Sequence, residues 1–473
     1  MRTSVVSFKN ITTSESIHRL DAPIYMTEGV LARKLVLQSP YPMLTIGDVS
    51  KRVWHAGRWR RVYVTNPQHG ITLLGSSAIL KADVSNEKLV STKYTDDIED
   101  KILKAGWTLI SCSGTIGNCV FANAKHAGKL ASQHVIRIWP NNMLKEGLVY
   151  AYLASKYGYA MLTQGTFGSV IQHIEPQNVE SIPIPSFPES FQKEVDDLIQ
   201  ESARLREEAA DMLSEAERLL KTSANLRDLT PEDYDYFGPR GAGREVSCFV
   251  RKRKDITTTT FNAFNLSERI KLCILDSLKQ CNTISFYDAI DENKLQSPSG
   301  VEVNEVKEGF GIMLINQSDI FNQIIKGKYI SKKKKYTKDL LKKGEILIAK
   351  IGTLGENETF CKCVYVGEEL EGQLVSSAFY RMKPISGIPS GYLYTWLSSD
   401  YGFRLLRSSQ FGTKQCYPNP AILYKYPIPI LSPDIMNEID QLVKEAHTKR
   451  YEANENERKA IRMVEEEIEK WNK

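Results

Sequence analysis

The stretch GLVYAYLASKYGYAMLTQGTFGSVIQHIEPQNVESIPIP, residues 147–185, returns without a gap as GYLYTWLSSDYGFRLLRSSQFGTKQCYPNPAILYKYPIP at residues 391–429. The offset is constant, since 391 minus 147 and 429 minus 185 both give 244. Upstream, SGTIG at 113–117 matches IGTLG at 351–355 at an offset of 238 (351 minus 113). A repeat this long exceeds the period of about 20–50 residues that is typical of solenoids. It therefore predicts a whole domain present twice, with pseudo-two-fold geometry and a target that has two halves.

A heptad pattern follows each copy. Apolar or small residues recur at steps of four and three, with charged residues between them, which is typical of a coiled-coil helix. The first seam consists of Phe191, Val195, Leu198, Ser202, Leu205, Ala209, Met212, Ala216 and Leu219. The same register returns 244 residues later, with Asn456 as a polar residue at a seam position. Two helices in matched register favour an intramolecular antiparallel coiled coil over the alternative, in which each helix lies only on its own domain.

These patterns divide the chain into five predicted segments. They are a first copied domain at 1–188, a helix at 189–224, a linker at 225–258, a second copied domain at 259–432 and a second helix at 433–473. Short apolar strands, such as 108–110 and 346–348, alternate with helical spacing at 148–162 and 392–406. The predicted fold is therefore mixed α/β (α+β), with two tandem domains joined by two long antiparallel helices.

The bulk composition is that of an ordinary globular protein, with 42% hydrophobic and 25% charged residues and a net charge of only +5. The first 20 residues contain no apolar run typical of a signal peptide, and no stretch approaches the ~18 apolar residues of a membrane span. Eight cysteines are scattered without a CxxC pair, which indicates reduced thiols. We therefore expect a cytoplasmic chain that contacts no membrane and binds no metal.

The sequence lacks the motifs of several catalytic classes. A Walker A loop needs Lys-Ser/Thr after its glycines, and the two Gly-Thr-apolar-Gly blocks are too short and lack the lysine. A tight strand-to-strand turn is the preferred interpretation of these blocks. YPNP at 417–420 has the wrong order for a methyltransferase Asn-Pro-Pro-aromatic motif. We predict no catalytic residue, and an enzyme with an unrecognised site is the weakest alternative.

In the order of these blocks, and in the helix that closes each copy, the chain resembles the specificity subunit of type I restriction–modification systems. The resemblance covers nearly the whole chain and includes HRLDA at 18–22, whereas TFNA at 260–263 departs from the family pattern. It implies that each copied domain is a target recognition domain for one half of an asymmetric, bipartite site on double-stranded DNA. It also implies that the coiled coil sets the unread gap between the halves.

The resemblance further implies a subunit of a phage-defence enzyme that has no catalytic site and no cofactor of its own. Its expected partners are DNA methyltransferase subunits, which would hold S-adenosylmethionine, and ATP-dependent restriction subunits in the complete enzyme. A protein-interaction scaffold with two modules and no DNA specificity is the alternative from a different class.

Candidate DNA contacts fall into two groups. Basic runs at 51–61, 251–254 and 326–343 suit phosphates, the last with nine lysines against one acid, although a solvated surface is the alternative. Two of these runs occupy comparable places in the copied domains, which favours DNA. The polar residues around the two Phe-Gly pairs differ between the copies, which is expected if the two domains recognise different half-sites. The predicted contact residues are Arg58, Arg60, Arg61, Thr115, Gln164, Thr166, Ser169, Gln172, Lys328, Lys332, Lys333, Lys334, Lys335, Thr353, Gln410, Thr413, Lys414 and Gln415.

Overall fold

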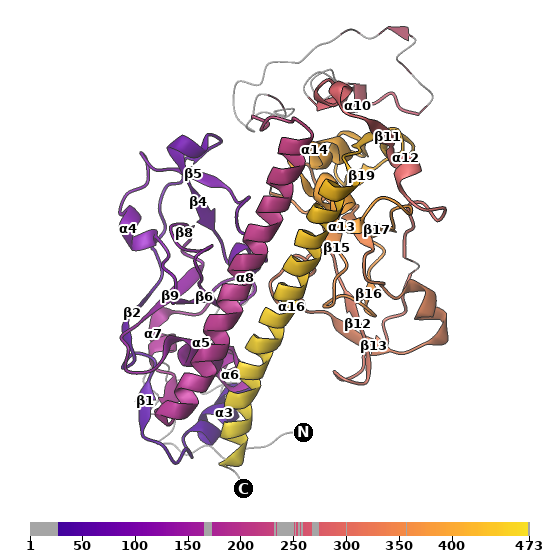
Figure 1. Cartoon of the computed structure of the whole chain (residues 1–473). Helices are drawn as coiled ribbons and strands as arrows, with labels where there is room; N and C mark the ends of the chain where they lie inside the picture. The colour runs from indigo at the N-terminus through magenta and orange to yellow at the C-terminus, as the bar shows by residue number, and fades with distance from the viewer. Residues whose placement is uncertain are drawn as a thin grey trace. The chain divides into compact units, whose positions relative to one another are not determined.

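The computed structural model describes residues 27–164, 173–230, 233, 250, 252–253, 256, 259–266, 274–298, 300–355 and 357–471. The chain divides into two compact units, Met1–Glu207 with Glu452–Lys473, and Glu208–Tyr451. Each unit holds one copied domain together with part of each long helix. These helices are α8 (Glu189–Ser223), drawn in magenta in Figure 1, and α16 (Pro433–Lys470), drawn in yellow.

The first unit is built on two four-stranded sheets. Their strand orders are β2-β9-β6-β7 and β3-β5-β4-β8, and a separate pair joins β1 to β10. The strands are β1 (Met43–Thr45), β2 (Ser50–Trp54), β3 (Tyr63–Val64), β4 (Gly70–Leu74), β5 (Leu89–Ser91), β6 (Thr108–Ser111), β7 (Cys119–Phe121), β8 (Leu130–Ala131), β9 (Val135–Pro140) and β10 (Pro183–Pro185). The helices are α3 (Glu28–Val36), α4 (Ile98–Lys101), α5 (Glu146–Ala154), α6 (Lys156–Gln164) and α7 (Pro176–Glu180).

The second unit has two three-stranded sheets, β15-β14-β17 and β13-β12-β16, and the pairs β11-β20 and β18-β19. Its strands are β11 (Thr283–Ser285), β12 (Gly311–Ile315), β13 (Lys328–Ser331), β14 (Ile346–Ala349), β15 (Cys363–Tyr365), β16 (Leu374–Val375), β17 (Phe379–Met382), β18 (Gln410–Phe411), β19 (Tyr417–Pro418) and β20 (Pro427–Pro429). Its helices are α10 (Ala263–Leu266), α12 (Phe286–Ala289), α13 (Ser390–Ser398), α14 (Asp400–Ser408) and α15 (Pro420–Leu423).

The strand pairing confirms that one domain occurs twice. In each unit a central strand (β6 or β14) has two antiparallel partners, and a second strand (β4 or β12) pairs with one antiparallel and one parallel neighbour. The parallel registers correspond, with Leu74 opposite Ala131 and Ile315 opposite Val375. Both Pro-Ile-Pro blocks form a short strand against the start of their own domain. The predicted mixed fold is therefore correct, and the repeated sequence blocks mark repeated topology.

The segment predicted to be helical in each copy, 148–162 and 392–406, forms two consecutive helices. The break falls at Ser155, whose hydroxyl donates to the Tyr152 carbonyl at 2.6 Å and accepts from the Gly158 amide at 3.2 Å. A Cβ on Gly158 would lie only 2.2 Å from the Tyr152 oxygen, so the second helix can begin this close only at a glycine. The same contacts recur 244 residues later at Ser399 and Gly402. The apolar period hid the break because α5 is buried on nearly every side and α6 continues with the buried residues Met161 and Leu162.

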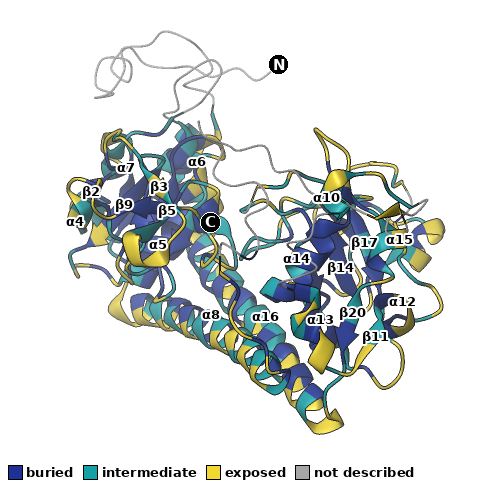
Figure 2. Cartoon of the chain, turned by 90° about the horizontal axis from the view of Figure 1, so that it is seen from above, coloured by how far each residue is buried: buried dark blue, intermediate teal, exposed yellow. Residues whose placement is uncertain are grey.

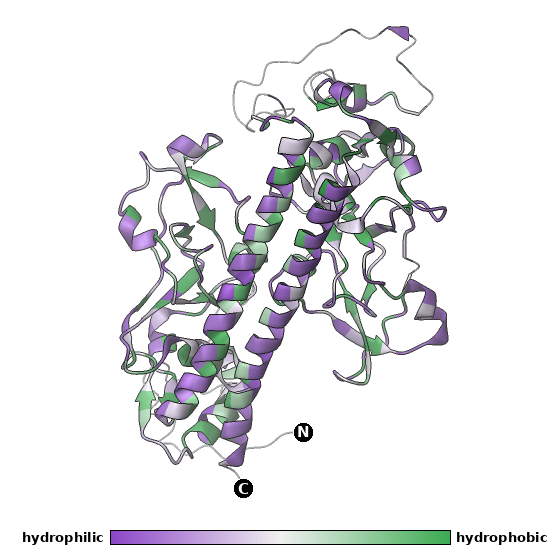
Figure 3. Cartoon of the chain, in the orientation of Figure 1, coloured by the Kyte–Doolittle hydropathy of each residue, from purple (hydrophilic) through white to green (hydrophobic). Residues whose placement is uncertain are grey.

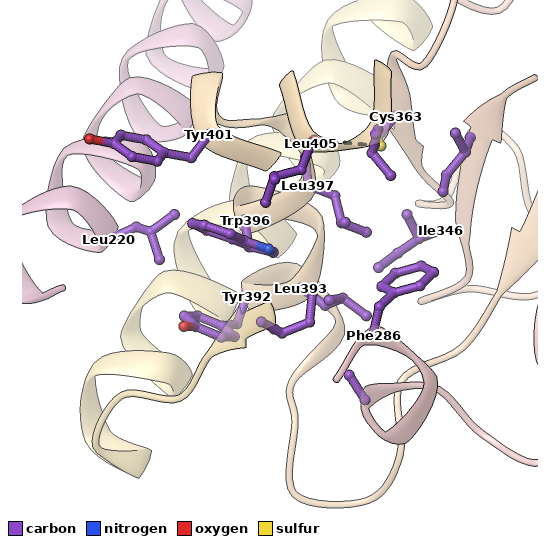
Figure 4. Close-up of a cluster of buried hydrophobic side chains, with 14 of the residues drawn as sticks. Leu220, Phe286, Ile346, Cys363, Tyr392, Leu393, Trp396, Leu397, Tyr401 and Leu405 are labelled. Atoms are coloured by element: carbon purple, nitrogen blue, oxygen red, sulfur yellow. Dashed lines mark hydrogen bonds between the residues drawn. The ribbon is translucent and has the colours of Figure 1, made fainter. Parts of the chain in front are cut away.

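The second unit's core gathers around α13 and α14. Figure 4 shows Leu393 and Leu397 toward Ile346 of β14 and Phe286 of α12, and Trp396 and Tyr392 on the side of Leu220 of α8. Trp396 is 1% exposed, and a fully buried large side chain contributes about 1.5–3 kcal/mol. In Figure 3, the strands inside the domains are largely green, which marks hydrophobic residues, and the long helices carry a mixed green and purple pattern. The end of α8 is thus part of the second domain's core.

Within each unit the two long helices lie against each other in antiparallel direction. In the first unit Phe187 contacts Trp471 at 5.9 Å between ring centroids, while further along α8 the Ser202 hydroxyl donates to the Ala453 carbonyl at 2.8 Å. In the second unit Glu208 pairs with Lys449 at 2.8 Å. Figure 2 shows buried positions alternating with exposed ones along both helices. The predicted antiparallel helix pair is confirmed.

The polar residues in the seam of α16 differ from the prediction. Asn456 is only partly buried, whereas Asn454 and Glu457 are each 4% exposed. Arg206 of α8 contacts both, donating to Asn454 at 2.8 Å and pairing with Glu457 at 2.6 Å. The difference arises because α16 packs against the first domain as well as α8, which moves the buried face by about one residue from the strict heptad.

Candidate nucleic-acid interface

The SGTIG block forms the hairpin turn between β6 and β7, which confirms the strand-to-strand interpretation. Gly114 and Gly117 both have φ near +80°, a conformation that favours glycine. The Ser111 hydroxyl and the Asn118 amide both donate to the Thr115 carbonyl, the second at 3.1 Å. These inner contacts hold the backbone of the turn, and the Thr115 side chain is exposed.

The end of α6 lies beside this turn. A Cβ on Gly117 would stand 2.9 Å from Thr163 and 3.0 Å from the Tyr159 ring, so the turn and the helix are in close approach. Gln164, the last residue of α6, is partly exposed.

 Thr166, Ser169 and Gln172 themselves lie outside the described residues, so their place in the interface stays a prediction.

The arginine-rich run follows β2 and reaches the same turn. Arg58 and Arg60 are exposed, while Arg61 is partly buried with its guanidinium 4.9 Å from the centre of the Trp59 ring. Arg61 also donates to the Gln133 side-chain oxygen. The run therefore lies beside the loop that joins β8 to β9, on the turn side of the first domain.

Three residues in this region were not predicted as contacts from the sequence. Ser113, at the start of the turn, hydrogen-bonds to the His134 ring, and Gln133 contacts the same ring at 2.9 Å. Burial and the positive charges of Arg61, His173 and Arg58 hold the pKa of His134 below its ordinary value. No local sequence pattern predicts this contact, because Ser113 and His134 come together only when β6 pairs with β9.

The corresponding turn of the second domain, 351–355, is held by different side chains. The Gln317 amide donates to the Ile351 carbonyl at 2.6 Å and to the Thr359 hydroxyl at 3.0 Å. Arg407 of α14 donates to the Gly355 carbonyl at 2.8 Å. Thr353 is exposed, as Thr115 is in the first domain.

The second Phe-Gly pair lies in a small hairpin, β18–β19, beside this turn. Phe411 is 47% exposed and packs on Tyr417 with 5.7 Å between ring centroids. Gly412 has a φ of +98°, and the three predicted contacts that follow it, Thr413, Lys414 and Gln415, are exposed. The hairpin therefore presents three polar side chains at the surface.

Gln410 differs from the prediction for this hairpin. Its side chain is 5% exposed, and its backbone carbonyl accepts from Asn265 at 2.9 Å. A side chain enclosed in this way does not face a bound duplex, so the structure does not support Gln410 as a base contact. The strand position explains the difference, because successive side chains of a strand point to opposite faces.

The lysine run is less positive than its sequence indicates. Lys328 pairs with Glu305, and both Lys333 and Lys335 pair with Glu302, the latter at 2.7 Å. These lysines hold the pKa of the Glu302 carboxyl down at about 2. Lys332 and Lys334 are exposed and form no ion pair within the described part of the chain. The acids come from a separate segment, which a count along the run cannot reveal.

The two basic runs do not occupy comparable places, so that expectation is wrong. The arginine run precedes β4, whereas the lysine run includes β13 and follows β12, the counterpart of β4. The segment that precedes β12 carries Glu302 and Glu305, which bind the lysines. Residues 332–335 also follow the end of β13 that pairs with the start of β12. Gln317, which contacts the turn at 351–355, lies beyond the opposite end of β12. The third run, 251–254, is described only at Lys252 and Arg253.

Within the described residues, no group of three or more His, Cys, Asp or Glu side chains is arranged to hold a metal ion. The six cysteines in the described ranges are free thiols. The same ranges contain no helix with the length and apolar character needed to span a bilayer.

Comparison with known proteins gives one family match. Residues 43–200 match the family described as "Type I restriction modification DNA specificity domain". The matched range runs from β1 into α8, and thus covers the first domain and the start of its helix. No curated protein sequence matches the chain.

Solved structures of low similarity were also found. One is the S subunit of a type I restriction–modification system from M. genitalium, with 12% identity and a TM-score of 0.37, covering 91% of this chain and 96% of that one. Another is the HsdS subunit from Thermoanaerobacter tengcongensis, with 13% identity and a TM-score of 0.28, covering 91% and 96%. At these TM-scores the solved structures carry no argument, and the family match applies to residues 43–200.

Proposed function

We propose that the chain is a DNA sequence-specificity subunit of a restriction–modification complex, and that its two domains read the two halves of one bipartite, gapped site. The match of residues 43–200 to the type I restriction modification DNA specificity domain supports this proposal. The duplicated topology carries this proposal. Each domain presents a glycine turn with an exposed threonine, Thr115 or Thr353, beside the end of a helix. Two similar modules with different surface side chains suit two different half-sites.

The proposed contacts use different chemistry in the two domains. The first offers Arg58, Arg60 and Arg61, and arginine can bind a guanine edge with two parallel hydrogen bonds. The second offers Thr413, Lys414 and Gln415, whose hydroxyl, ammonium and amide groups suit base edges or phosphates. This difference between corresponding surfaces supports an asymmetric target.

We assign the exposed lysines 332 and 334 to phosphate contact. Such contacts are largely blind to sequence, but they position the protein on the duplex. Gln164, Thr166, Ser169 and Gln172 remain proposed contacts on the first domain.

The partners follow from the family. We propose that the chain docks DNA methyltransferase subunits, that S-adenosylmethionine is bound by those subunits, and that ATP-dependent restriction subunits join the complete enzyme in the cytoplasm. The helices over 189–224 and 433–473 would set the gap between the half-sites. Seven residues inserted into only one of them should alter the gap or destabilise the fold, and an unchanged motif with unchanged stability would contradict this spacer role.

Methylation mapping tests the proposal directly. Cellular DNA would be sequenced by a single-molecule method, with and without this gene, in a host that expresses the adjacent methyltransferase. Loss of one bipartite, gapped motif on deletion would support the proposal. An unchanged set of motifs, together with salt-independent or absent DNA binding, would instead favour a scaffold that binds proteins.

A further inference from the structure

Four side chains of the first domain form a chain of hydrogen bonds beside the glycine turn, which we call the Arg61 relay. It runs from Arg61 through Gln133 and His134 to Ser113. Its members come from three separate segments: the run after β2, the loop between β8 and β9, and the turn after β6. The relay therefore links one of the proposed DNA contacts to the turn.

The chemistry of arginine fixes the direction of every bond in the relay. A guanidinium only donates, so the Gln133 oxygen must accept from Arg61. The Gln133 amide nitrogen then donates to Nε2 of His134 at 2.9 Å, and Nε2 must accept. The imidazole proton is thus on Nδ1, where it donates to the Ser113 hydroxyl. This arrangement requires a neutral His134.

The surroundings of His134 favour the neutral ring. Burial lowers its pKa, and so do Arg61, His173, Arg58 and His55, which all place positive charge toward it. The Glu175 carboxylate faces His55 at 3.5 Å. At neutral pH the relay is therefore intact.

The relay holds Arg61 in one position at the surface. Its guanidinium lies 4.9 Å from the centre of the Trp59 ring, and the Lys101 ammonium lies 5.2 Å from the same ring. Gln133 engages one end of the guanidinium. An arginine held in place before binding loses less side-chain entropy when it contacts a base or phosphate.

We propose that Gln133 and His134 are positioning residues that hold Arg61 for contact with the first half-site, and that protonation of His134 releases it. A protonated ring carries a hydrogen on Nε2 and cannot accept from Gln133. The amide must then turn its oxygen toward the ring, and Arg61 loses its acceptor. This inference rests on the proposed function and adds a pH-dependent element to the same site.

The expected direction of the change in DNA affinity with pH separates this mechanism from a general charge effect. Protonated histidines add positive charge, which strengthens sequence-independent DNA binding at low pH. Release of Arg61 instead weakens binding to the specific site as pH falls. The second domain has Ser377 and Ala378 at the positions 244 residues after Gln133 and His134, so only the first half-site should respond.

The experiment uses the full chain in complex with its methyltransferase subunits. Fluorescence anisotropy would measure affinity from about pH 5.5 to about pH 8 at fixed ionic strength. The probes are a duplex with the motif found by methylation mapping, the same duplex with its first half scrambled, and a random-sequence duplex. We expect preference for the intact motif over the scrambled one to fall by about tenfold at the acid end, the cost of one good arginine contact.

Three variants test the roles. His134→Gln keeps an acceptor but cannot be protonated at neutral or mildly acid pH, and it should flatten the pH profile while retaining preference at neutral pH. Gln133→Leu and Arg61→Ala should each reduce the preference for the intact motif over the scrambled one by about tenfold. The double variant that carries both substitutions should lose no more preference than either single variant. His69→Gln, at an exposed position, is the matched control. Thermal unfolding would show that each variant is folded.

The outcomes distinguish the two levels of the proposal. Additive losses in the double variant, or a His134→Gln profile that follows the wild type, would overturn the relay while leaving the proposed function intact. A wild-type complex that shows no motif preference at any pH would overturn both.

Discussion

The backbone amide of Gly147 donates to the Asp196 carboxylate at 2.8 Å, which joins the first turn of α5 to α8. The same bond occurs 244 residues later, where Gly391 donates to Asp440 of α16 at 2.7 Å. An amide in the first turn of a helix has no partner within the helix, so the aspartate satisfies a donor that would otherwise be unpaired. Each domain is thus fixed to its own long helix by an identical contact.

Gly147→Ala should destabilise the first unit. An added Cβ would lie 2.6 Å from the Asp196 carboxylate and 3.0 Å from its Cα, so either the contact or the helix must shift. Loss of the bond leaves a buried amide unpaired, at a cost of about 1–3 kcal/mol. Thermal unfolding would measure the effect, and Gly75→Ala, which adds a Cβ to open space, is the control. Equal melting temperatures for the two variants would contradict this account.

Glu457→Ala should be more costly. The Glu457 carboxylate accepts from the Tyr150 hydroxyl at 2.6 Å and pairs with Arg206 at 2.6 Å, and both of its partners are largely buried. Removing it leaves a buried guanidinium without its charge partner, which typically costs about 3–5 kcal/mol.

Chemical denaturation would measure this loss. As the matched control, Asp197→Ala removes the exposed ion pair with Lys193 and should change the free energy of unfolding by less than about 1 kcal/mol. Comparable losses of unfolding free energy for the two variants would show that burial of the Glu457 contacts adds nothing to stability.

His447→Phe should stabilise the second unit and reduce its sensitivity to acid. The His447 ring lies 4.9 Å from Tyr365 and 5.8 Å from Tyr394, and its Nε2 is enclosed with no hydrogen-bond partner in the described ranges. Burial and Arg450 lower the pKa of this histidine to about 3. Phenylalanine keeps the ring contacts and removes the unpaired nitrogen.

The sign of the acid effect follows from this pKa. The fold favours the neutral ring, so the unfolded chain takes up a proton near pH 6.5 that the folded chain does not. Stability is full above about pH 6.5 and falls by up to about 1.4 kcal/mol per pH unit toward pH 3. Thermal unfolding at several pH values should show a smaller decline for His447→Phe than for the wild type, and parallel declines would contradict the assignment.

Lys332→Ala with Lys334→Ala should weaken binding to a random-sequence duplex. Each lost phosphate contact should reduce the slope of log affinity against log salt concentration by about 0.9. The matched control is Lys333→Ala with Lys335→Ala, because these lysines already pair with Glu302 and should contribute less. A larger effect from the control pair would show that the ion pairs open when DNA binds.

Alanine substitution of Thr413, Lys414 and Gln415 should change the recognised sequence in only one half of the motif. These side chains are exposed on the β18–β19 hairpin and make no contribution to the buried core. Methylation mapping would show either a relaxed half-site or loss of methylation. A change in the other half would contradict the assignment of one domain to each half.

Much of the fold followed from the sequence because it depends on local periodicity and on internal repetition. The heptads predicted both long helices, and the repeated Gly-Thr-apolar-Gly blocks predicted the two hairpin turns. The break at Ser155 escaped prediction because buried apolar residues continue through the helices on both sides of it. The site was harder to predict, since Gln410 has a polar side chain typical of a contact residue and yet lies inside the domain.

The sequence by itself determined that one domain occurs twice, that a long helix follows each copy, and that basic and polar residues gather in a few segments. Only the tertiary structure decided which of those charges are available. Glu302 neutralises two lysines that lie about 30 positions further along the chain, and strand pairing brings Ser113 to His134. The physical reason is that helices and turns depend on neighbouring residues, whereas ion pairs and hydrogen-bond relays depend on which distant strands lie side by side.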